Sequence, residues 1–295
     1  MSEDFELVLY DRLNIIRDTI SKYGEDNFYV SFSGGKDSTV LHYLIDMAIP
    51  NNKIPRVFIN TGIEYNDIVS FVNELSKEDD RFITIRPNKP IKQMLEENGY
   101  PFKSKEHSMR VEQFNRGVNG NFIKKYTRQT DYNGSFICPK KLMYQFEERG
   151  KYNYSNKCCN ELKKKPIRQW EKENNKKVSI TGMRREEGGN RRRLTCAIFK
   201  NNKLIHFHPL IPVSEEFLDW FIDKYNIKLC KLYYPPFNFV RTGCKGCPFS
   251  LKLRKQLEIM EEYLPAERKQ CEIIWKPVYD EYRRIKYRLK TKKDT

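Results

Sequence analysis

A glycine pair, a lysine and two serines follow directly after a short apolar run near the beginning of the chain. The run covers residues 28–32, and the polar group after it consists of Ser33, Gly34, Gly35, Lys36, Asp37 and Ser38. Glycines let a phosphate approach the backbone closely, and the first N–H groups of a following helix add positive potential. The spacing predicts a phosphate loop, residues 33–38, between a strand and a helix. An ordinary Gly-Gly turn is the alternative.

Two pairs of cysteines have the spacing of metal ligands. Cys244 and Cys247 stand two residues apart, which lets both thiolates bind one metal centre, whereas Cys158 and Cys159 are adjacent. Neighbouring side chains on a helix diverge by about 100°, so they suit different irons of a cluster better than one small ion. The four thiolates therefore predict a [4Fe–4S] cluster. A zinc site and four unligated thiols are the alternatives.

Polar residues also follow the next apolar run, residues 56–60. Thr61, Gly62 and Glu64 come directly after it. Ligands of open parallel sheets bind beyond the carboxyl ends of the strands. We therefore expect these three residues to face a ligand bound at the phosphate loop, on its adenosine side if the ligand is an adenine nucleotide. For Glu64, a charge at the beginning of a helix with no ligand is an equally good interpretation.

Segments with helical periodicity alternate with short apolar runs along most of the chain. The expected strands are residues 28–32, 56–60, 82–86, 178–182 and 204–210, and the expected helices between and around them are residues 5–23, 39–49, 65–75 and 215–225. This alternation predicts an α/β fold with a doubly wound parallel sheet.

Two regions depart from the alternation. A polar, tyrosine-rich insertion at about residues 100–156 has no clear period and is typical of a lid, a binding insertion or disorder. The last residues favour two long helices, split near Leu264 and Pro265. We therefore expect a nucleotide-binding domain over residues 1–249, which contains the insertion, and a C-terminal helical extension over residues 250–295.

The chain is strongly basic. Its 55 lysines and arginines exceed its 39 acidic residues, for a formal net charge of +16. This balance favours polyanionic partners, and the basic, tyrosine-rich insertion suits a nucleic acid, with a solvated basic surface as the alternative. There is no signal-peptide core and no apolar run of membrane-spanning length. The eight cysteines are then expected to be reduced, which predicts a cytoplasmic protein.

Five motifs occur together in a fixed order. They are the phosphate loop, the Cys158–Cys159 pair, Thr-Gly-Met-Arg-Arg-Glu-Glu at residues 181–187, His-Pro-Leu at 208–210 and Thr-Gly-Cys-Lys-Gly-Cys at 242–247. In this order they resemble the phosphoadenylyl-sulfate (PAPS) reductase family, particularly its iron–sulfur branch. That family belongs to the PP-loop ATP pyrophosphatase superfamily.

The resemblance implies a fold, a cluster and several site residues. The fold is a parallel sheet of the adenine nucleotide alpha-hydrolase-like type. The [4Fe–4S] cluster would be held by the four paired cysteines, and the phosphate loop, with Lys36 and Asp37 in catalytic roles, would bind the nucleotide. The segment with Gly182, Arg184 and Arg185 would contact its sulfate or phosphate side. Two guanidiniums at a strand end suit oxyanions, although a solvated basic turn is the alternative.

Two departures from the assimilatory reductases point to ATP. Those enzymes carry a nucleophilic cysteine in a mobile tail, whereas residues 287–295 contain none. The complete loop is similar to family members that bind ATP with Mg²⁺, such as tRNA thiolases and DNA-phosphorothioation sulfurtransferases. We therefore expect adenylylation of an acceptor in sulfur transfer, with tRNA or DNA as acceptor and a sulfur-donor protein as partner. A homo-oligomer is left open.

Two other functions are alternatives to ATP-dependent adenylylation. The first is a PAPS or adenylyl-sulfate reductase that uses an external thiol electron donor such as thioredoxin. The second is a nucleic-acid-binding module whose nucleotide site is vestigial.

Overall fold

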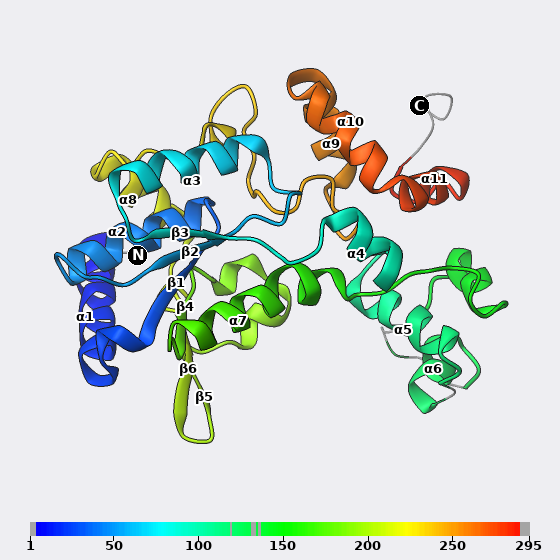
Figure 1. The fold of residues 1–295 in the computed structure, drawn as a ribbon, viewed down its shortest axis with the longest axis horizontal. Helices are drawn as coiled ribbons and strands as arrows, with labels where there is room; N and C mark the ends of the chain where they lie inside the picture. The colour runs from blue at the N-terminus through cyan, green and yellow to red at the C-terminus, as the bar shows by residue number, and fades with distance from the viewer. Residues whose placement is uncertain (1–3, 119, 131–133, 135–136, 290–295) are drawn as a thin grey trace. The chain divides into compact units, whose positions relative to one another are not determined.

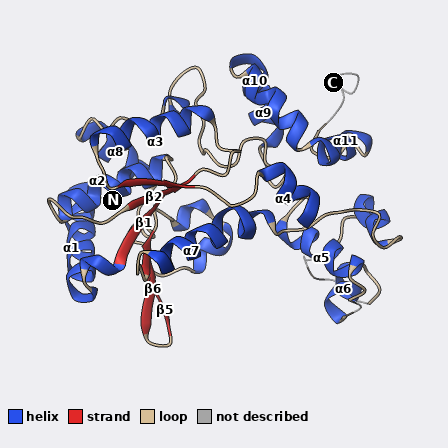
Figure 2. Cartoon of the chain, in the orientation of Figure 1, coloured by secondary structure: helices blue, strands red, loops and turns tan. Residues whose placement is uncertain are grey.

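The computed structural model describes residues 4–118, 120–130, 134 and 137–289. Parts of the predicted insertion and the end of the predicted C-terminal extension therefore lie outside the described residues. Within the described part, six strands form a sheet in the order β3-β2-β1-β4-β6-β5, drawn in Figures 1 and 2. The strands are β1 (Phe28–Phe32), β2 (Arg56–Ile59), β3 (Phe82–Ile85), β4 (Val178–Ile180), β5 (Ala197–Lys200) and β6 (Lys203–Phe207).

Helices surround and follow this sheet. In chain order they are α1 (Phe5–Tyr23), α2 (Lys36–Ala48), α3 (Asn66–Glu78), α4 (Ile91–Asn98), α5 (Lys105–Asn115), α6 (Asn121–Tyr126), a π-helical turn (Asn160–Lys164), α7 (Lys165–Glu173), α8 (Glu215–Lys224), α9 (Leu253–Tyr263), α10 (Pro265–Ile274) and α11 (Lys276–Arg284). Over the described residues, none of the helices combines the length and the apolar character that crossing a membrane requires.

The sheet is covered by helices on both faces. Its strands pair in parallel except β5, which is antiparallel to β6 at the edge. Side chains alternate along β1, so Phe28 and Val30 enter a core formed with α1, α2 and α8. Tyr29 points to the other face and packs edge-on against Trp170 of α7. The predicted doubly wound α/β sheet is therefore confirmed.

The chain divides into two compact units. The first consists of Met1–Asn60, Glu64–Arg86 and Pro166–Thr242, and it contains the whole sheet. The second consists of Thr61–Ile63, Pro87–Lys165 and Gly243–Thr295, and it contains α4, α5, α6 and the C-terminal helices.

The predicted insertion contains regular structure that periodicity did not indicate. Helix α5 begins at Lys105, where the Ser104 hydroxyl accepts a hydrogen bond from the His107 N–H. The His107 ring is fully buried between the Tyr126 hydroxyl, at 2.9 Å, and the side-chain amide oxygen of Gln145, at 2.8 Å. Because this core uses histidine, glutamine and aromatic side chains, it lacks the aliphatic spacing that marks a helix in sequence.

Two other expectations about secondary structure are wrong. The C-terminal segment forms three helices rather than two, because Pro277 lies in the first turn of α11 and cannot continue α10. The apolar pattern also did not predict β5, which forms a hairpin with β6. Asn201 and Asn202 both have positive φ, at 50° and 59°, and this Asn-Asn turn is the signal that could have revealed the hairpin.

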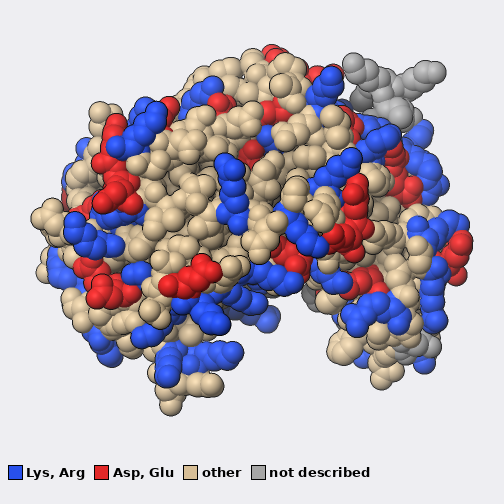
Figure 3. Space-filling view, in the orientation of Figure 1, with Lys and Arg blue, Asp and Glu red and all other residues tan. Residues whose placement is uncertain are grey.

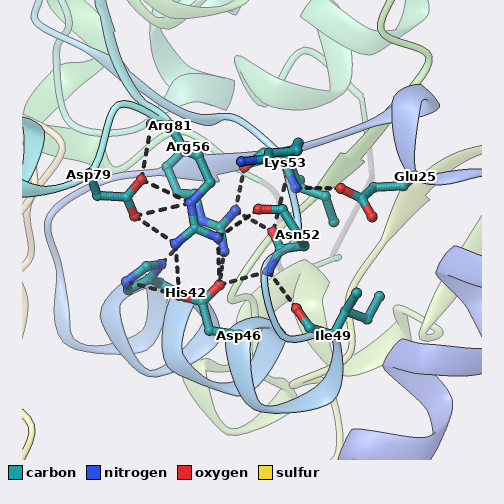
Figure 4. Close-up of polar contacts among 10 residues, drawn as sticks. Glu25, His42, Asp46, Ile49, Asn52, Lys53, Arg56, Asp79 and Arg81 are labelled. Carbon is teal, nitrogen blue, oxygen red and sulfur yellow. Dashed lines mark hydrogen bonds and ion pairs between the residues drawn. The ribbon is translucent and has the colours of Figure 1, made fainter.

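A buried arginine network ties α2 to β2 and β3 (Figure 4). It consists of His42, Asp46, Arg56, Asp79 and Arg81. The Asp46 carboxylate accepts hydrogen bonds from Arg56 at 2.6 Å and from Arg81 at 2.8 Å. The ligand atoms of His42, Asp46 and Asp79 lie within 4.8 Å of one another, but the two guanidiniums occupy them. Burial, followed by the charge of Arg56, lowers the pKa of His42 to about 4, so the ring is neutral. The group is an ion-pair network rather than a metal centre.

We expect the Asp46→Asn substitution to lower the free energy of unfolding by about 2 to 3 kcal/mol, because it leaves the fully buried Arg56 without its charged partner. Urea denaturation followed by circular dichroism at pH 7 measures the change. Glu97→Gln is the control, since Glu97 forms a pair with Lys89 at the surface, where solvent screens the charges, and it should cost much less stability. Equal losses in the two variants would contradict the assignment.

The same network predicts loss of stability in acid. Burial opposes ionisation of Asp46 and Asp79, but hydrogen bonds from Arg81 and the charge of Arg56 hold the pKa of both carboxyls below the ordinary value. A lowered folded pKa gives stability that is present above the unfolded pKa, about 3.9, and is lost as pH falls through the folded pKa. Urea denaturation between pH 6 and pH 2 should therefore show a steeper decline below about pH 4 in the wild type than in Asp46→Asn. Parallel profiles would count against this linkage.

Candidate functional site

The phosphate loop connects β1 to α2, and the hydroxyls of its two serines form hydrogen bonds within it. Ser38 donates to the Gly35 carbonyl oxygen at 2.9 Å and lies 3.0 Å from the Ser33 hydroxyl. Gly34 has a φ of +70°, and a Cβ there would meet Ile68 of α3 at 2.9 Å. Only glycine fits this turn. The loop thus places the first turn of α2 directly after the sheet edge.

Two hydroxyls lie over Gly35, one from Tyr233, which the sequence did not indicate, and one from Thr242, which begins the motif at residues 242–247. The Tyr233 and Thr242 hydroxyls are 2.8 Å apart, and a Cβ on Gly35 would meet them at 3.1 and 3.5 Å. The Tyr233 hydroxyl also accepts a hydrogen bond from the Lys36 backbone N–H. A donor of the helix N-terminus is therefore satisfied by a side-chain oxygen in this structure. No local motif marks Tyr233, which comes almost two hundred residues after the loop.

The Lys36 ammonium is paired with acidic residues of α8. It donates to Glu215, and to Asp219 at 3.0 Å. Burial opposes the charged form, but these two hydrogen bonds outweigh it and raise the pKa of Lys36. The Glu215 pKa is lowered for the complementary reason, since burial is outweighed by Lys36 and Arg184. The lysine thus remains charged and lies beside the first turn of α2.

Arg184 is the most deeply buried cation beside the phosphate loop, with 5% of its surface exposed. Its guanidinium donates to Asp37 at 2.5 Å, to Glu186 at 2.8 Å, and to Glu215. Burial by itself would lower the Arg184 pKa. The hydrogen bond to Asp37 and the charges of Asp37 and Glu215 outweigh burial and raise it. Gly182 permits this approach, because a Cβ there would meet the Asp37 carbonyl oxygen at 2.8 Å. The structure therefore brings Asp37, Gly182 and Arg184 together.

Two further arginines, Arg191 and Arg241, lie near the carboxylates of Glu187 and Asp37. Arg191 donates to Glu187 at 2.9 Å, Arg241 also pairs with Glu187, and the charge of Asp37 acts on both guanidiniums. Arg241 was missed in the sequence because it lies outside the recognised motifs. Arg185, which the sequence singled out, is exposed, and its backbone N–H donates to the Ile211 carbonyl oxygen.

The remaining expected nucleotide contacts follow β2. Thr61 is buried, Gly62 has a φ of +82°, and Glu64 is buried just before α3. Thr61 and Gly62 belong to the second compact unit, whereas Glu64 belongs to the first.

The structure brings the four paired cysteines together within the second unit. Cys158 interacts electrostatically with Cys159, Cys244 and Cys247. Cys247 interacts in the same way with Cys244 and Cys159. A hydrogen bond to Cys159, together with burial, raises the pKa of Cys158. The same hydrogen bond lowers the pKa of Cys159, and the lysines at 105, 163 and 164 lower it further. Of this pair, Cys159 is therefore the thiol that ionises more readily.

The spread of the sulfurs bears on the kind of metal centre. Throughout the described residues, no three of the four sulfurs lie within 4.8 Å of one another. A single tetrahedral zinc ion, with bonds of about 2.3 Å, would hold its sulfurs about 4 Å apart. Cys138, Cys230 and Cys271 are buried and Cys196 is partly buried, in agreement with packing roles.

One protein-family model matches most of the chain. The model of the phosphoadenosine phosphosulfate reductase domain matches residues 27–135 and 120–250. An uncharacterized protein of Methanocaldococcus jannaschii is 24% identical over 274 residues, which are 91% of this chain and 53% of the relative. The chain therefore spans about half the length of the curated relative that it matches.

Solved structures were also compared. A PAPS reductase from Candida auris, in a phosphate complex, has a TM-score of 0.49 at 11% identity and covers 83% of this chain and 95% of its own. A Candida glabrata FMN adenylyltransferase with ATP has a TM-score of 0.48 at 13% identity, over 83% of this chain and 64% of its own. The NH3-dependent NAD synthetase of Campylobacter jejuni has a TM-score of 0.43 at 12% identity, over 94% and 95%. Because the family model covers most of its length, the chain belongs to the phosphoadenosine phosphosulfate reductase domain family.

Proposed function

We propose that this protein is an ATP-dependent enzyme that activates an acceptor by adenylylation in sulfur transfer. The observation that carries the proposal is the complete phosphate loop at the beginning of α2, with Lys36 and Arg184 beside it. A loop with bare glycines, a helix N-terminus and two cations suits the pyrophosphate part of ATP. Membership in the PAPS reductase domain family supports an adenine nucleotide as the ligand.

The residues around the loop suggest how the reaction would proceed. Binding of the β- and γ-phosphates would draw Lys36 away from Glu215 and Asp219 and displace the Tyr233 hydroxyl from the Lys36 N–H. An acceptor oxygen would then attack the α-phosphorus. The bond to the pyrophosphate oxygen would break, and Lys36 with the helix N-terminus would neutralise the departing charge. The carboxylates of Asp37 and Glu215 are of the kind that Mg²⁺ prefers.

The cysteines support a [4Fe–4S] cluster in the same protein. Four thiols that interact electrostatically form a donor set of the right type and number for such a cluster. Cys158, Cys159, Cys244 and Cys247 would hold the cluster. When bound, such a cluster supplies an electron acceptor or an iron that binds sulfur.

The acceptor class is proposed from charge. Lysines and arginines are interspersed with acidic side chains over the face drawn in Figure 3, and the whole chain has a formal net charge of +16. The half-exposed Arg241 and the basic segment at 191–193 add positive charge near the phosphate loop. We propose tRNA or DNA as the acceptor, and a thiol-bearing or persulfide-bearing protein as the sulfur source.

PAPS reduction with an external thiol is the second candidate, and family membership favours it. A reductase with a nucleophile of its own needs an accessible thiol; without one, the external thiol must attack the sulfur itself. Cys271, the last cysteine of the sequence, is fully buried in α10, and burial raises its pKa to about 12. It therefore lacks both the access and the ionisation of a nucleophile. Sulfite release from PAPS in the presence of thioredoxin would favour this candidate over ATP-dependent activation.

We expect Lys36→Ala to reduce ATP-dependent pyrophosphate release by about 100-fold, because a cation beside the departing pyrophosphate is lost. A coupled pyrophosphate assay with candidate acceptors measures the rate. Lys172→Ala removes the same charge from an exposed position of α7 and should leave the rate unchanged. Release at the wild-type rate in Lys36→Ala would remove the proposed role of the loop.

We expect Cys159→Ser to abolish most of the iron and acid-labile sulfide in protein that is purified without oxygen, because a cluster needs all four thiolates for stable binding. Metal and sulfide analysis with visible absorption measures the loss. Cys230→Ser, at a buried cysteine of the first unit, is the control and should retain both. Zinc without sulfide in the wild type would replace the cluster by a zinc site, and a wild type free of metal would contradict both.

A further inference from the structure

The C-terminal helices hold the backbone of the cysteine loop, residues 243–249. The Trp275 indole N–H donates to the Lys245 carbonyl oxygen at 3.1 Å. The Tyr279 hydroxyl donates to the Gly246 carbonyl oxygen, and the Tyr282 hydroxyl donates to that of Pro248 at 3.0 Å. Tyr279 and Tyr282 are three residues apart on α11, so both hydroxyls leave the same face of the helix. All of these residues belong to the second compact unit.

One of these hydroxyls is linked to a cysteine sulfur through a single peptide group. The Pro248 carbonyl accepts from Tyr282 and also from the Arg288 guanidinium. The N–H of the same peptide belongs to Phe249, and it donates to the Cys247 sulfur. Donation to the oxygen of a peptide group polarises it and strengthens its N–H as a donor.

The neighbouring tyrosine has no such link. Tyr279 donates to the Gly246 carbonyl, and the N–H of that peptide belongs to Cys247 itself. This N–H donates to the Cys244 carbonyl oxygen at 3.2 Å, not to a sulfur. Gly246 lies so close to α10 and α11 that a Cβ would clash with the Tyr279 hydroxyl. Tyr279 is thus a matched contact to the same loop, made from the same helix.

We propose that Tyr282 is a positioning residue that tunes the Cys247 sulfur through the Pro248–Phe249 peptide. The inference rests on the proposed cluster for its functional meaning. Hydrogen bonds to the sulfurs favour the reduced, more negative form of a cluster and so raise its reduction potential. Loss of the Tyr282 hydroxyl should weaken the Phe249 N–H bond to sulfur and lower that potential.

The test compares Tyr282→Phe with Tyr279→Phe in the full chain. In iron-loaded protein, we expect Tyr282→Phe to reduce the equilibrium constant for reduction about threefold, which is about 28 mV for one electron. Tyr279→Phe should leave the midpoint potential unchanged, and both variants should keep the iron content. Equal potentials in all three proteins, or an equal shift in both variants, would overturn the proposal.

A second measurement does not depend on the cluster. In metal-free protein with ¹⁵N-labelled phenylalanine, the Phe249 amide proton should move upfield in Tyr282→Phe and stay in place in Tyr279→Phe. An unchanged resonance in Tyr282→Phe would refute the link even if the wild type binds no iron. Absence of iron from the wild type, with the expected amide shift, would instead refute only the proposed cluster.

Discussion

The candidate nucleotide site depends on a guanidinium that is buried at the carboxyl edge of the sheet. Arg184 follows β4 and is held by Asp37 of α2 and Glu215 of α8. Removing a charge from water costs several kcal/mol unless its partners stay in place. The pairing of Arg184 therefore fixes the segment after β4 against the first turns of two helices. Gly182 makes the approach to α2 sterically feasible.

This arrangement lets one carboxylate serve two cations. Glu215 pairs with both Lys36 and Arg184 in this structure. If Lys36 turned toward a phosphate, Glu215 would keep Arg184 as its partner and would not become an isolated half-buried charge. The exchange of Lys36 between carboxylates and phosphate therefore costs less than breaking an isolated buried pair. The site is charge-balanced without ligand, and it can still release a cation toward one.

The sequence predicts best the helices and strands whose signals are local. The bounds of α1 and β1 agree with the predictions, because apolar periodicity and Gly24 mark them within a few residues. Tyr233, Glu215 and Arg241 were not foreseen as site residues, because they reach the phosphate loop only through the fold and carry no motif of their own. The sequence did not predict helix α5, because its buried face includes His107 and Ser108 rather than a row of aliphatic residues.

The roles of the C-terminal helices could not be read from their sequence at all. The amphipathic pattern of α11 indicates that Tyr279 and Tyr282 are buried, but not that their hydroxyls are directed to carbonyl groups on either side of Cys247. A buried tyrosine hydroxyl must find a partner, and here the partners are backbone groups of a loop with little regular structure. Because its Gly246 and Pro248 carbonyls accept from Tyr279 and Tyr282, the loop is held by side chains from α11. Helix α11 and Arg288 are therefore part of the scaffold that holds the loop with Cys244 and Cys247.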